Sequence, residues 1–409
     1  MNITRRTLMA GAAGAAAATG LAPRRARAAA PVIKFGVLTD LSGPYKDIGG
    51  PLSVACARLA VEDFGAAAKG MTVEVVAADH QNKPDVGAGI ARQWFDRDGV
   101  DVILDVPNSG VALAVAGVAK AKNKVFLPSN PGTSDLTGKA CNANTIHWSY
   151  DTWMLAHATG SALVKTGGTS WYFITADYAF GHALQRDATQ FVTGAGGKVL
   201  GAAAYPFPGT SDFSGFLLQA QASGAKVVAF ANAGADTINS IKQAKEFGIT
   251  QTLAGLLVFI SDVHSLGLPT AQGLVISSPF YWNLNDRTRA FSQRLWAKVP
   301  NVRAGMGQAG DYSAALAYLK VAQDMGVANA KKDGAATVAR MKAMPTDDDV
   351  FGKGSIREDG RKLHPAYLFQ VKKPDESKQP WDYYTLRATI PADEAFRPLK
   401  DGGCPLVKS

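Results

Sequence analysis

Two successive series of alternating strand and helix patterns constrain the fold of this chain most strongly. The first series begins with the β-rich run 32–38, and the second restarts after Asp151. Short apolar runs alternate with segments of helical apolar spacing through both series. This alternation is typical of parallel sheets covered by helices on both faces. The sequence therefore predicts an α/β protein with two similar doubly wound, Rossmann-like lobes.

The expected elements follow one another closely along the chain. Strands are predicted at 32–38, 72–76, 100–106, 125–128, 171–175, 198–204, 226–231, 253–259 and 273–277. Helices are predicted at 52–64, 84–95, 111–120, 154–164, 183–193, 213–222 and 237–247. The later chain is helix-rich and ends in short strands, with helices at 312–322 and 335–343 and strands near 367–371 and 383–386. We expect these late strands to return and complete the earlier sheets.

Residues 1–28 have the pattern of an export signal. Arg5 and Arg6 precede an Ala/Gly-rich apolar run at 10–22, and a small-x-small cleavage site ends at Ala28. The paired arginines predict a twin-arginine (Tat) address, and the apolar run is too short to span a bilayer. We therefore expect cleavage near Ala28 and a soluble product in the periplasm. The alternative is a disordered, alanine-rich N-terminus.

The net charge gives no indication of a nucleic-acid partner. The formal charge of the 409 residues is +9, but residues 1–28 hold five arginines and no acidic residue, which leaves +4 for the rest. A small positive charge is ordinary for a soluble protein. The remaining chain of about 380 residues is long enough for two packed domains. It holds no later apolar stretch of membrane-spanning length.

Three cysteines predict one disulfide and one free thiol in an oxidising compartment. Cys56 lies in an apolar helical run, where we expect it to be a small core residue. Cys141 and Cys404 lie in polar, glycine-containing loops. We therefore pair Cys141 with Cys404.

The loops that follow the predicted strands are the candidate ligand-binding segments, because open parallel sheets bind ligands at the carboxyl ends of their strands. These loops contain small residues, hydroxyls, amides and aromatic rings, which suit a compact organic ligand. They lie at 39–50, 107–110, 129–136, 176–181, 232–236 and 278–283.

The motifs of the common enzyme and metal sites are absent from the sequence. There is no Gly-x-Ser-x-Gly elbow, no phosphate loop and no Cys-x-x-Cys, and the six histidines show no ligand spacing. The acidic run 347–349 lacks the pattern of a calcium loop. We therefore predict no cofactor, no metal and no enzymatic activity. An enzyme on this fold would need a nucleophile–base pair that the sequence does not offer.

Four short motifs, in this order and spacing, give the chain a family resemblance. They are Leu41-Ser42-Gly43-Pro44 leading to Gly49-Gly50, then 60–64, 128–137 and 177–181. With them the chain resembles the leucine/isoleucine/valine-type (type I) periplasmic substrate-binding proteins of ABC transporters, over nearly all of its length beyond the signal. The resemblance implies two α/β lobes that are joined by three crossing strands and close on a ligand like a clamshell.

The resemblance also implies how the chain divides between the lobes. Lobe one is expected at 31–146 plus 279–356, and lobe two at 147–278 plus 357–390. The tail 391–409 is expected to pack on lobe one, which would let Cys404 reach Cys141. The crossings would fall near 145–150, 276–280 and 356–363.

The family's ligand-binding positions can be carried over one by one. In lobe one they fall on the loops after the third and fourth strands, where N–H groups at a helix start favour a carboxylate. Pro131 departs from the small residue usual there and removes one N–H donor. Including the loop after the first strand and the lobe-two loops, the ligand-binding residues are expected to be Tyr45, Ile48, Asn108, Ser109, Asn130, Pro131, Gly132, Thr133, Tyr178, Phe180, Asn232, Asp236, Leu256 and Phe280.

The nature of the ligand depends on one position. Amino-acid-binding members carry a glutamate that pairs the ligand's ammonium group, whereas this chain has Leu256 or Leu257 there. Burying an ammonium without an anion is costly, although Asp236 or Asp262 could substitute. We therefore favour an aromatic or other apolar acid that lacks an α-amino group. The aromatic residues at 280–282 could equally belong to the core or the hinge.

The resemblance implies a transport role. The expected function is the periplasmic solute-binding component of an ABC importer, a monomer that delivers its small carboxylate ligand to a permease and ATPase complex. One alternative is a periplasmic ligand sensor of the same fold that passes a signal to a receptor. A second alternative is binding of a branched-chain amino acid or an amide.

Overall fold

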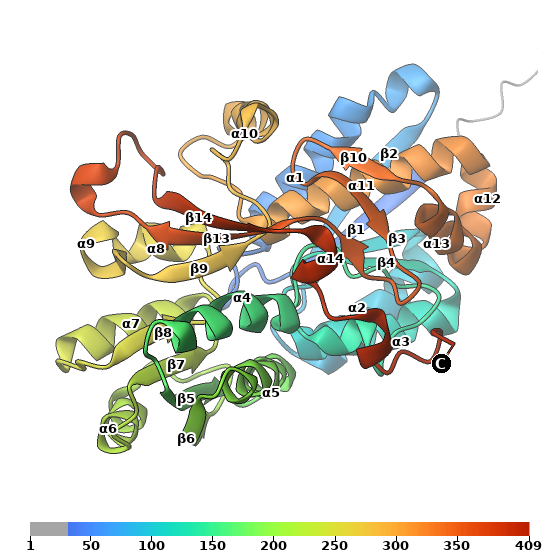
Figure 1. Cartoon of the computed structure of the whole chain (residues 1–409). Helices are drawn as coiled ribbons and strands as arrows, with labels where there is room; N and C mark the ends of the chain where they lie inside the picture. Colours follow the sequence, from blue (N-terminus) through green and yellow to red (C-terminus); the bar gives the residue numbers. More distant parts are fainter. Residues whose placement is uncertain (1–31, 409) are drawn as a thin grey trace, which may run out of the picture. The chain divides into compact units, whose positions relative to one another are not determined.

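Two four-stranded parallel sheets form the centres of the two lobes (Figure 1). Their strand orders are β2-β1-β3-β4 and β6-β5-β7-β8. The computed structural model describes residues 32–408, so the predicted signal at 1–28 lies outside the described residues. The prediction of a two-lobed, doubly wound α/β fold is confirmed, while the proposed division of the chain between the lobes stays a prediction.

The helices and strands have the following bounds. The strands are β1 (Val32–Thr39), β2 (Thr72–Asp79), β3 (Val102–Asp105), β4 (Val125–Pro128), β5 (Ser170–Ala176), β6 (Lys198–Tyr205), β7 (Val227–Ala231), β8 (Thr252–Gly255), β9 (Val275–Ser278), β10 (Thr346–Asp348), β11 (Gly352–Ile356), β12 (Lys362–Leu363), β13 (Ala366–Val371) and β14 (Tyr384–Ile390). The α-helices are α1 (Gly50–Phe64), α2 (Pro84–Gln93), α3 (Ser109–Lys122), α4 (Thr152–Lys165), α5 (Ala179–Gly194), α6 (Ser214–Ala222), α7 (Ala235–Glu246), α8 (Ile260–Leu266), α9 (Leu268–Ala271), α10 (Asp286–Lys298), α11 (Met306–Met325), α12 (Val327–Lys332), α13 (Gly334–Ala343) and α14 (Ala392–Ala395).

Helices cover both faces of the first sheet. Val102 and Leu104 of β3 belong to the larger hydrophobic cluster, which includes residues of α1 and α11. Ile103 between them belongs to a second cluster, with residues of α2 and α3. Successive side chains of a strand point to opposite faces, so β3 is buried on both sides. This explains why its sequence is apolar from Val102 to Leu104 rather than alternating.

Polar side chains cap the starts of several helices. The Asn108 side chain accepts a hydrogen bond from Val111 N over 3.0 Å at the start of α3. The Asp151 side chain accepts one from Met154 N over 2.8 Å at the start of α4. Such caps satisfy backbone donors that have no partner within the helix. They therefore fix the loops that lead from sheet to helix.

The late strands were expected to complete the earlier parallel sheets, and this expectation is wrong. β13 pairs antiparallel with both β14 and β9, and these three strands form a sheet of their own. The loop 372–383 joins β13 to β14, and an antiparallel pair needs no crossover helix between its strands. The three strands lie side by side next to α4 in Figure 1.

The predicted strand at 253–259 is too long. β8 ends at Gly255, and α8 begins at Ile260 after a short turn. Asp262 explains the change, because its carboxylate accepts a hydrogen bond from Phe259 N over 2.9 Å and caps α8. An apolar run alone does not distinguish a strand from the start of a buried helix.

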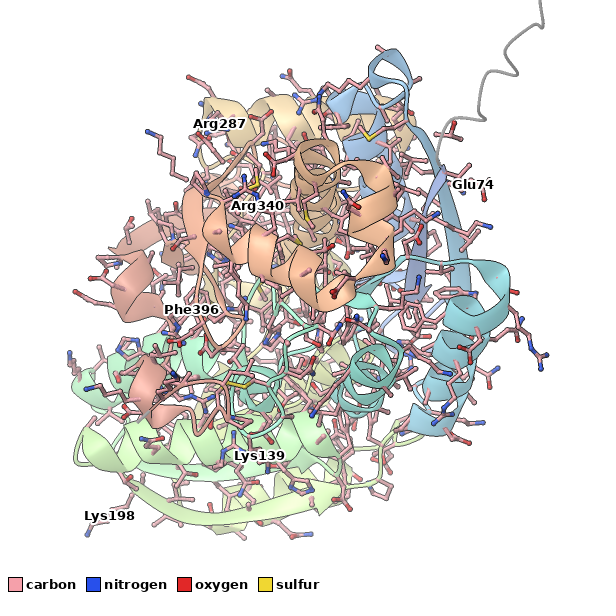
Figure 2. The ribbon with its side chains drawn as sticks, turned by 90° about the vertical axis from the view of Figure 1, so that its right-hand side faces the viewer. Glu74, Lys139, Lys198, Arg287, Arg340 and Phe396 are labelled. Carbon is pink, nitrogen blue, oxygen red and sulfur yellow. A yellow bond between two sulfur atoms is a disulfide. The ribbon has the colours of Figure 1, made fainter. Side chains whose placement is uncertain are left out.

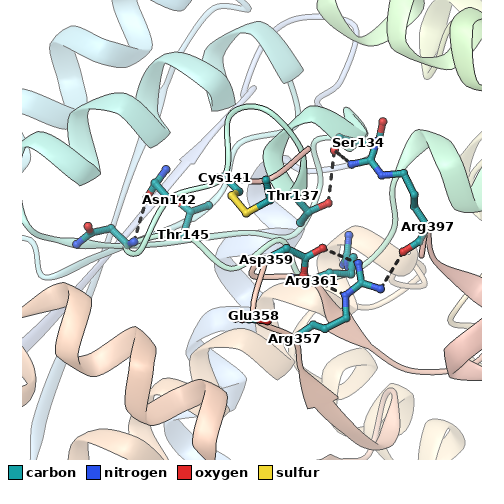
Figure 3. Close-up of a disulfide and its surroundings, with 12 residues drawn as sticks. Ser134, Thr137, Cys141, Asn142, Thr145, Arg357, Glu358, Asp359, Arg361 and Arg397 are labelled. Carbon is teal, nitrogen blue, oxygen red and sulfur yellow. Dashed lines mark hydrogen bonds and ion pairs between the residues drawn. A yellow bond between two sulfur atoms is a disulfide. The ribbon is translucent and has the colours of Figure 1, made fainter. Parts of the chain in front are cut away.

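The C-terminal tail lies against the segment that follows β4 (Figure 3). A disulfide joins Cys141 to Cys404, with 5.6 Å between the Cα atoms, while Cys56 is a buried free thiol. The Arg397 guanidinium donates to the carbonyl of Ser134 over 2.9 Å. These two contacts tie the end of the chain to the first half of the molecule.

No helix among residues 32–408 has the length and apolar character needed to cross a membrane. Figure 2 shows charged side chains such as Glu74, Lys198 and Arg287 pointing away from the ribbon. Within the same range, no cluster of three or more His, Cys, Asp or Glu side chains is placed to hold a metal ion.

Candidate ligand-binding site

Two tyrosines from the two halves of the molecule are in contact beyond the carboxyl ends of the strands. Tyr45 follows β1 and Tyr178 follows β5, and their hydroxyl groups are hydrogen bonded to each other. Tyr45 is buried and Tyr178 is half-buried. Burial is the main cause that raises the pKa of both hydroxyls well above their ordinary value, so both stay protonated. The loops after the first strands of both sheets are therefore in direct contact.

Phe207, which the sequence analysis did not single out, packs on both tyrosines. Its ring centroid lies 4.4 Å from that of Tyr178 and 5.2 Å from that of Tyr45, in stacked orientations. This ring lies in the loop after β6, which is not among the predicted ligand-binding loops. An aromatic residue between two prolines directly after a predicted strand was the available signal.

A second contact between the two halves involves only the backbone. Ala235 N, at the start of α7, donates to the Pro44 carbonyl over 3.3 Å. The preceding Gly234 has a φ of 60°, and a Cβ there would lie 2.6 Å from the Pro44 oxygen. This position therefore requires glycine both for its conformation and for the close approach. The turn at 232–236, which was predicted to face the ligand, lies against the loop after β1.

Within that turn, Asn232 and Asp236 are occupied by their own lobe. Asn232 is buried; it donates to Ser240 Oγ over 3.0 Å and accepts from Thr237 Oγ1 over 2.8 Å. Asp236 accepts from the Tyr205 hydroxyl over 2.8 Å. Burial raises the pKa of Asp236 to about 6, and its charge in turn helps to raise the pKa of Tyr45.

Asn108 and Ser109 connect the loops after β3 and β4. The Asn108 amide caps α3 and also lies 3.4 Å from Asn82 Oδ1, to which it donates. Ser109 Oγ accepts from Thr133 N over 3.1 Å. The two predicted carboxylate-binding loops are thus held together at the N-terminus of the 14-residue helix α3.

Asn130 is hydrogen bonded to the loop after β1. Its side-chain nitrogen donates to the Ile48 carbonyl over 2.9 Å and to Asp105 Oδ1 over 2.7 Å. Burial raises the pKa of Asp105 to about 7. Ile48 itself packs in the hydrophobic core. Asn130 and Ile48 therefore contact each other within the first half of the chain, and their role in ligand binding stays a prediction.

Pro131, Gly132 and Thr133 form the loop after β4. The His147 ring lies 2.6 Å from the Pro131 carbonyl, and Thr152 N donates to the Gly132 carbonyl over 2.7 Å. Among the described residues, the Gly132 N–H is the one backbone donor between 129 and 135 that has no hydrogen-bond partner. Because Pro131 has no N–H, the loop presents this single donor.

Phe180 in the first turn of α5 reaches this loop from the other lobe. Its ring lies so close to Gly132 that a Cβ on the glycine would come within 2.6 Å of a ring carbon. Phe180 is buried, and its ring centroid lies 6.0 Å from that of Tyr178. The structure therefore brings together Tyr45, Tyr178, Phe180 and the loop after β4.

Leu256 and Phe280 lie apart from this group. Leu256 is buried in the hydrophobic core directly after β8. Phe280 lines a separate small cavity, together with Phe259, Met306 and Tyr384. Neighbouring Trp282 donates from its indole to the Trp381 carbonyl over 2.8 Å and so supports the β13–β14 hairpin.

The two carboxylates that could replace the family's glutamate differ in their surroundings. Asp262 is fully buried, caps α8, and has a pKa that burial raises to about 7. Asp236 directly follows Ala235, whose N–H donates to the Pro44 carbonyl next to Tyr45, and its charge contributes to the raised pKa of both tyrosines. Asp236 is therefore the nearer of the two to the contact between the lobes.

Comparison with known proteins agrees with this architecture. The family described as periplasmic binding protein matches residues 32–378. A periplasmic binding protein from Burkholderia mallei is 47% identical over 92% of this chain and 99% of its own, with a TM-score of 0.89. A branched-chain amino acid ABC transporter periplasmic ligand-binding protein from Burkholderia xenovorans is 40% identical over 91% of this chain and 99% of its own, with a TM-score of 0.79.

A more distant structure shares the fold. It is the solute-binding protein of an ABC transporter from R. palustris in complex with benzoate, 21% identical over 92% of this chain and 100% of its own, with a TM-score of 0.79. No curated protein sequence matches the chain. The family match and the two Burkholderia structures confirm the resemblance seen in the sequence motifs, and the chain belongs to the periplasmic binding protein family.

Proposed function

We propose that this protein is the periplasmic solute-binding component of an ABC importer and binds a small carboxylate between its two lobes. The contact of Tyr45 with Tyr178 carries the proposal, because these residues follow the carboxyl ends of strands in the two different sheets. Ligands of open α/β sheets bind at such ends. The protein would deliver its ligand, as a monomer, to a membrane permease and its ATPase.

The loop after β4 would bind the ligand's carboxylate. The Gly132 N–H is an available donor, and the loop is joined to the N-terminus of α3 through Ser109. A helix N-terminus carries partial positive charge and unpaired N–H groups, both of which favour an anion. Asn108, Asn130 and Thr133 would act from behind, by holding these two loops in register.

We favour an aromatic or other apolar acid as the ligand. Tyr45, Tyr178 and Phe180 offer ring surfaces for offset or edge-on contacts with another ring. The expected position of the family's glutamate is occupied by Leu256 or Leu257, both buried, and Asp262 is engaged in capping α8. The benzoate complex of the R. palustris protein supports the suitability of this fold for such an acid.

A branched-chain amino acid or an amide is the second candidate. The Burkholderia xenovorans protein, 40% identical, is named as a branched-chain amino acid transporter component. Asp236 lies in the turn that contacts the loop after β1, and with a pKa of about 6 it is mostly ionised near pH 7 and could pair an ammonium group. An ammonium at that place would lower the pKa of Asp236 and thereby favour its charged form.

Binding would work by closure of the lobes and would make or break no bond. A ligand that touches both lobes binds the closed arrangement better than the open one, and so shifts the population towards it. The closed form would then dock on the permease. A sensor that passes its signal to a receptor would use the same movement, and neighbouring permease and ATPase genes, rather than a kinase gene, would favour transport.

A thermal-shift screen of the protein without residues 1–28 tests the proposal. The compounds are benzoate, 4-hydroxybenzoate, an aliphatic acid, leucine, valine and an aliphatic amide. A compound that binds only the folded protein raises the melting temperature by mass action. We expect a shift with the aromatic acids and none with the amino acids. A shift with leucine or valine alone would establish the second candidate and direct attention to Asp236.

A further inference from the structure

Phe207 occupies a position in the site that neither the motifs nor the family's ligand-binding positions indicate. Its ring is nearly parallel to those of Tyr178 and Tyr45, at interplanar angles of 17° and 24°. Since these two tyrosines come from different lobes, one ring from lobe two covers a hydrogen bond that joins the lobes.

The loop that carries Phe207 is anchored at both ends. Before it, Tyr205 ends β6 and donates its hydroxyl to Asp236 over 2.8 Å. After it, Phe213 packs edge-on against Tyr205 at 5.0 Å between ring centroids, and its N–H donates to Gln243 Oε1 over 2.7 Å. The loop between these anchors is therefore fixed in place against lobe two.

Between the anchors, Phe207 is turned inward. Its neighbours Pro206 and Pro208 are exposed, whereas Phe207 is half-buried and Tyr45 beneath it is 1% exposed. An exposed loop that turns one aromatic ring onto a residue of the opposite lobe has a geometry suited to holding the lobes together. Opening of the cleft would separate that ring from Tyr45 and admit water to the tyrosine hydroxyls.

We infer that Phe207 is a positioning residue for closure: it holds Tyr178 against Tyr45 and shields their hydrogen bond from water, and so stabilises the closed arrangement of the lobes. Stacking of Phe207 on the two tyrosine rings stabilises the closed state directly. Exclusion of water also strengthens the hydrogen bond beneath the ring, because the local dielectric falls. The inference rests on the proposed function in one respect: it assumes that closure of the lobes retains the ligand.

Four proteins test the inference: the wild type, Phe207→Ala, Phe207→Tyr and the control Phe247→Ala. Tyrosine keeps the ring at position 207, so Phe207→Tyr should behave as the wild type. Phe247 lies at the end of α7 and is 49% exposed, which makes it a matched aromatic truncation away from the site. Melting curves for all four establish that each is folded.

The first measurement needs no ligand. Nitration by tetranitromethane, followed by peptide mass spectrometry, reports the access of reagent to each tyrosine. We expect Phe207→Ala to increase nitration of Tyr45 and Tyr178 severalfold, while the core residue Tyr318 is unchanged as an internal reference. Equal nitration of Tyr45 in the wild type and in Phe207→Ala would overturn the inference.

The second measurement uses benzoate as the probe. If closure retains the ligand, Phe207→Ala should lower benzoate affinity by about tenfold through faster dissociation, and Phe207→Tyr should restore it. Failure of the wild type to bind benzoate would count against the proposed aromatic ligand and leave the nitration result to decide the role of Phe207. Equal benzoate affinity in the wild type and in Phe207→Ala would contradict that role.

Discussion

The ring of Phe180 in α5 lies directly against Gly132 in the loop after β4, at a distance that leaves no room for a side chain on the glycine. A Cβ at Gly132 would come within 2.6 Å of the ring. Gly132 follows a strand of one sheet and Phe180 a strand of the other, so we expect this contact to be lost when the lobes open. Gly132 is thus a point at which the sequence controls how closely the lobes can approach.

Substitution of Gly132 by alanine should therefore weaken ligand binding more than it weakens the fold. The added methyl group would keep the lobes from closing fully, and we expect an affinity loss of about tenfold or more, equivalent to roughly 1.4 kcal/mol or more. Calorimetric titration with the compound found by the thermal-shift screen measures it. Gly117→Ala in α3 is the matched control, because no atom lies within 4 Å of the Cβ added there. Equal affinity in both variants would contradict the assigned role of Gly132.

Replacing Tyr178 by alanine tests the position of the site itself. The change removes one hydroxyl of the pair with Tyr45 and the ring on which Phe207 stacks. Loss of a hydrogen bond and of a ring contact should lower affinity by about tenfold to a hundredfold, while Tyr178, being half-buried, contributes modestly to the fold. Titration and a melting curve separate these effects. An unchanged affinity would place the ligand elsewhere.

Much of the fold could be predicted because burial leaves a clear pattern in parallel strands. β3 and β7 are buried along their full length, and apart from Asp105 at the end of β3 both are continuous apolar runs between helical segments. The end of β8 could not be predicted in the same way. The run from Leu256 to Phe259 is apolar in either conformation, and only the cap by Asp262 shows that the chain has left the strand.

The candidate site was predictable to the extent that it follows from the topology. Tyr45, Tyr178 and Phe180 were predicted because they follow strands, and the structure brings them together. The contact of Phe207 with Tyr45 was not predictable, since it depends on the angle between the lobes rather than on any one segment. The same reason applies to the close approach of Gly234 and Pro44.

The buried carboxyl of Asp262 should make stability fall as the pH rises from about 4 to 7. Burial raises its pKa to about 7, so the folded protein binds a proton in this range that the unfolded chain has already released. The folded state is therefore favoured at the lower pH, and ionisation costs stability as the pH approaches 7.

Asp262→Asn removes this titration and keeps an oxygen that can accept from Phe259 N. Between pH 4 and 7 the wild type should lose about 3 to 4 kcal/mol more than the variant, which urea unfolding at several pH values measures. Other buried acids, Asp105 among them, contribute a pH dependence that both proteins share. Parallel pH profiles for the two proteins would show that Asp262 has an ordinary pKa.

Removal of the disulfide should destabilise the protein without altering the ligand site. Cys141 and Cys404 are 263 residues apart, and a crosslink that closes a long loop restricts the unfolded chain more than one that closes a short loop. The Cys141→Ser, Cys404→Ser double variant should lose about 2 to 5 kcal/mol of unfolding free energy in urea. Reductant should destabilise the wild type and leave this variant unchanged, because the variant holds no disulfide to cleave and Cys56 is already a free thiol. The residues that bring the lobes together lie on strand ends away from the bond, so affinity should be retained.

A stability of the double variant equal to that of the wild type would mean that contacts such as Arg397 with Ser134 hold the tail in place on their own.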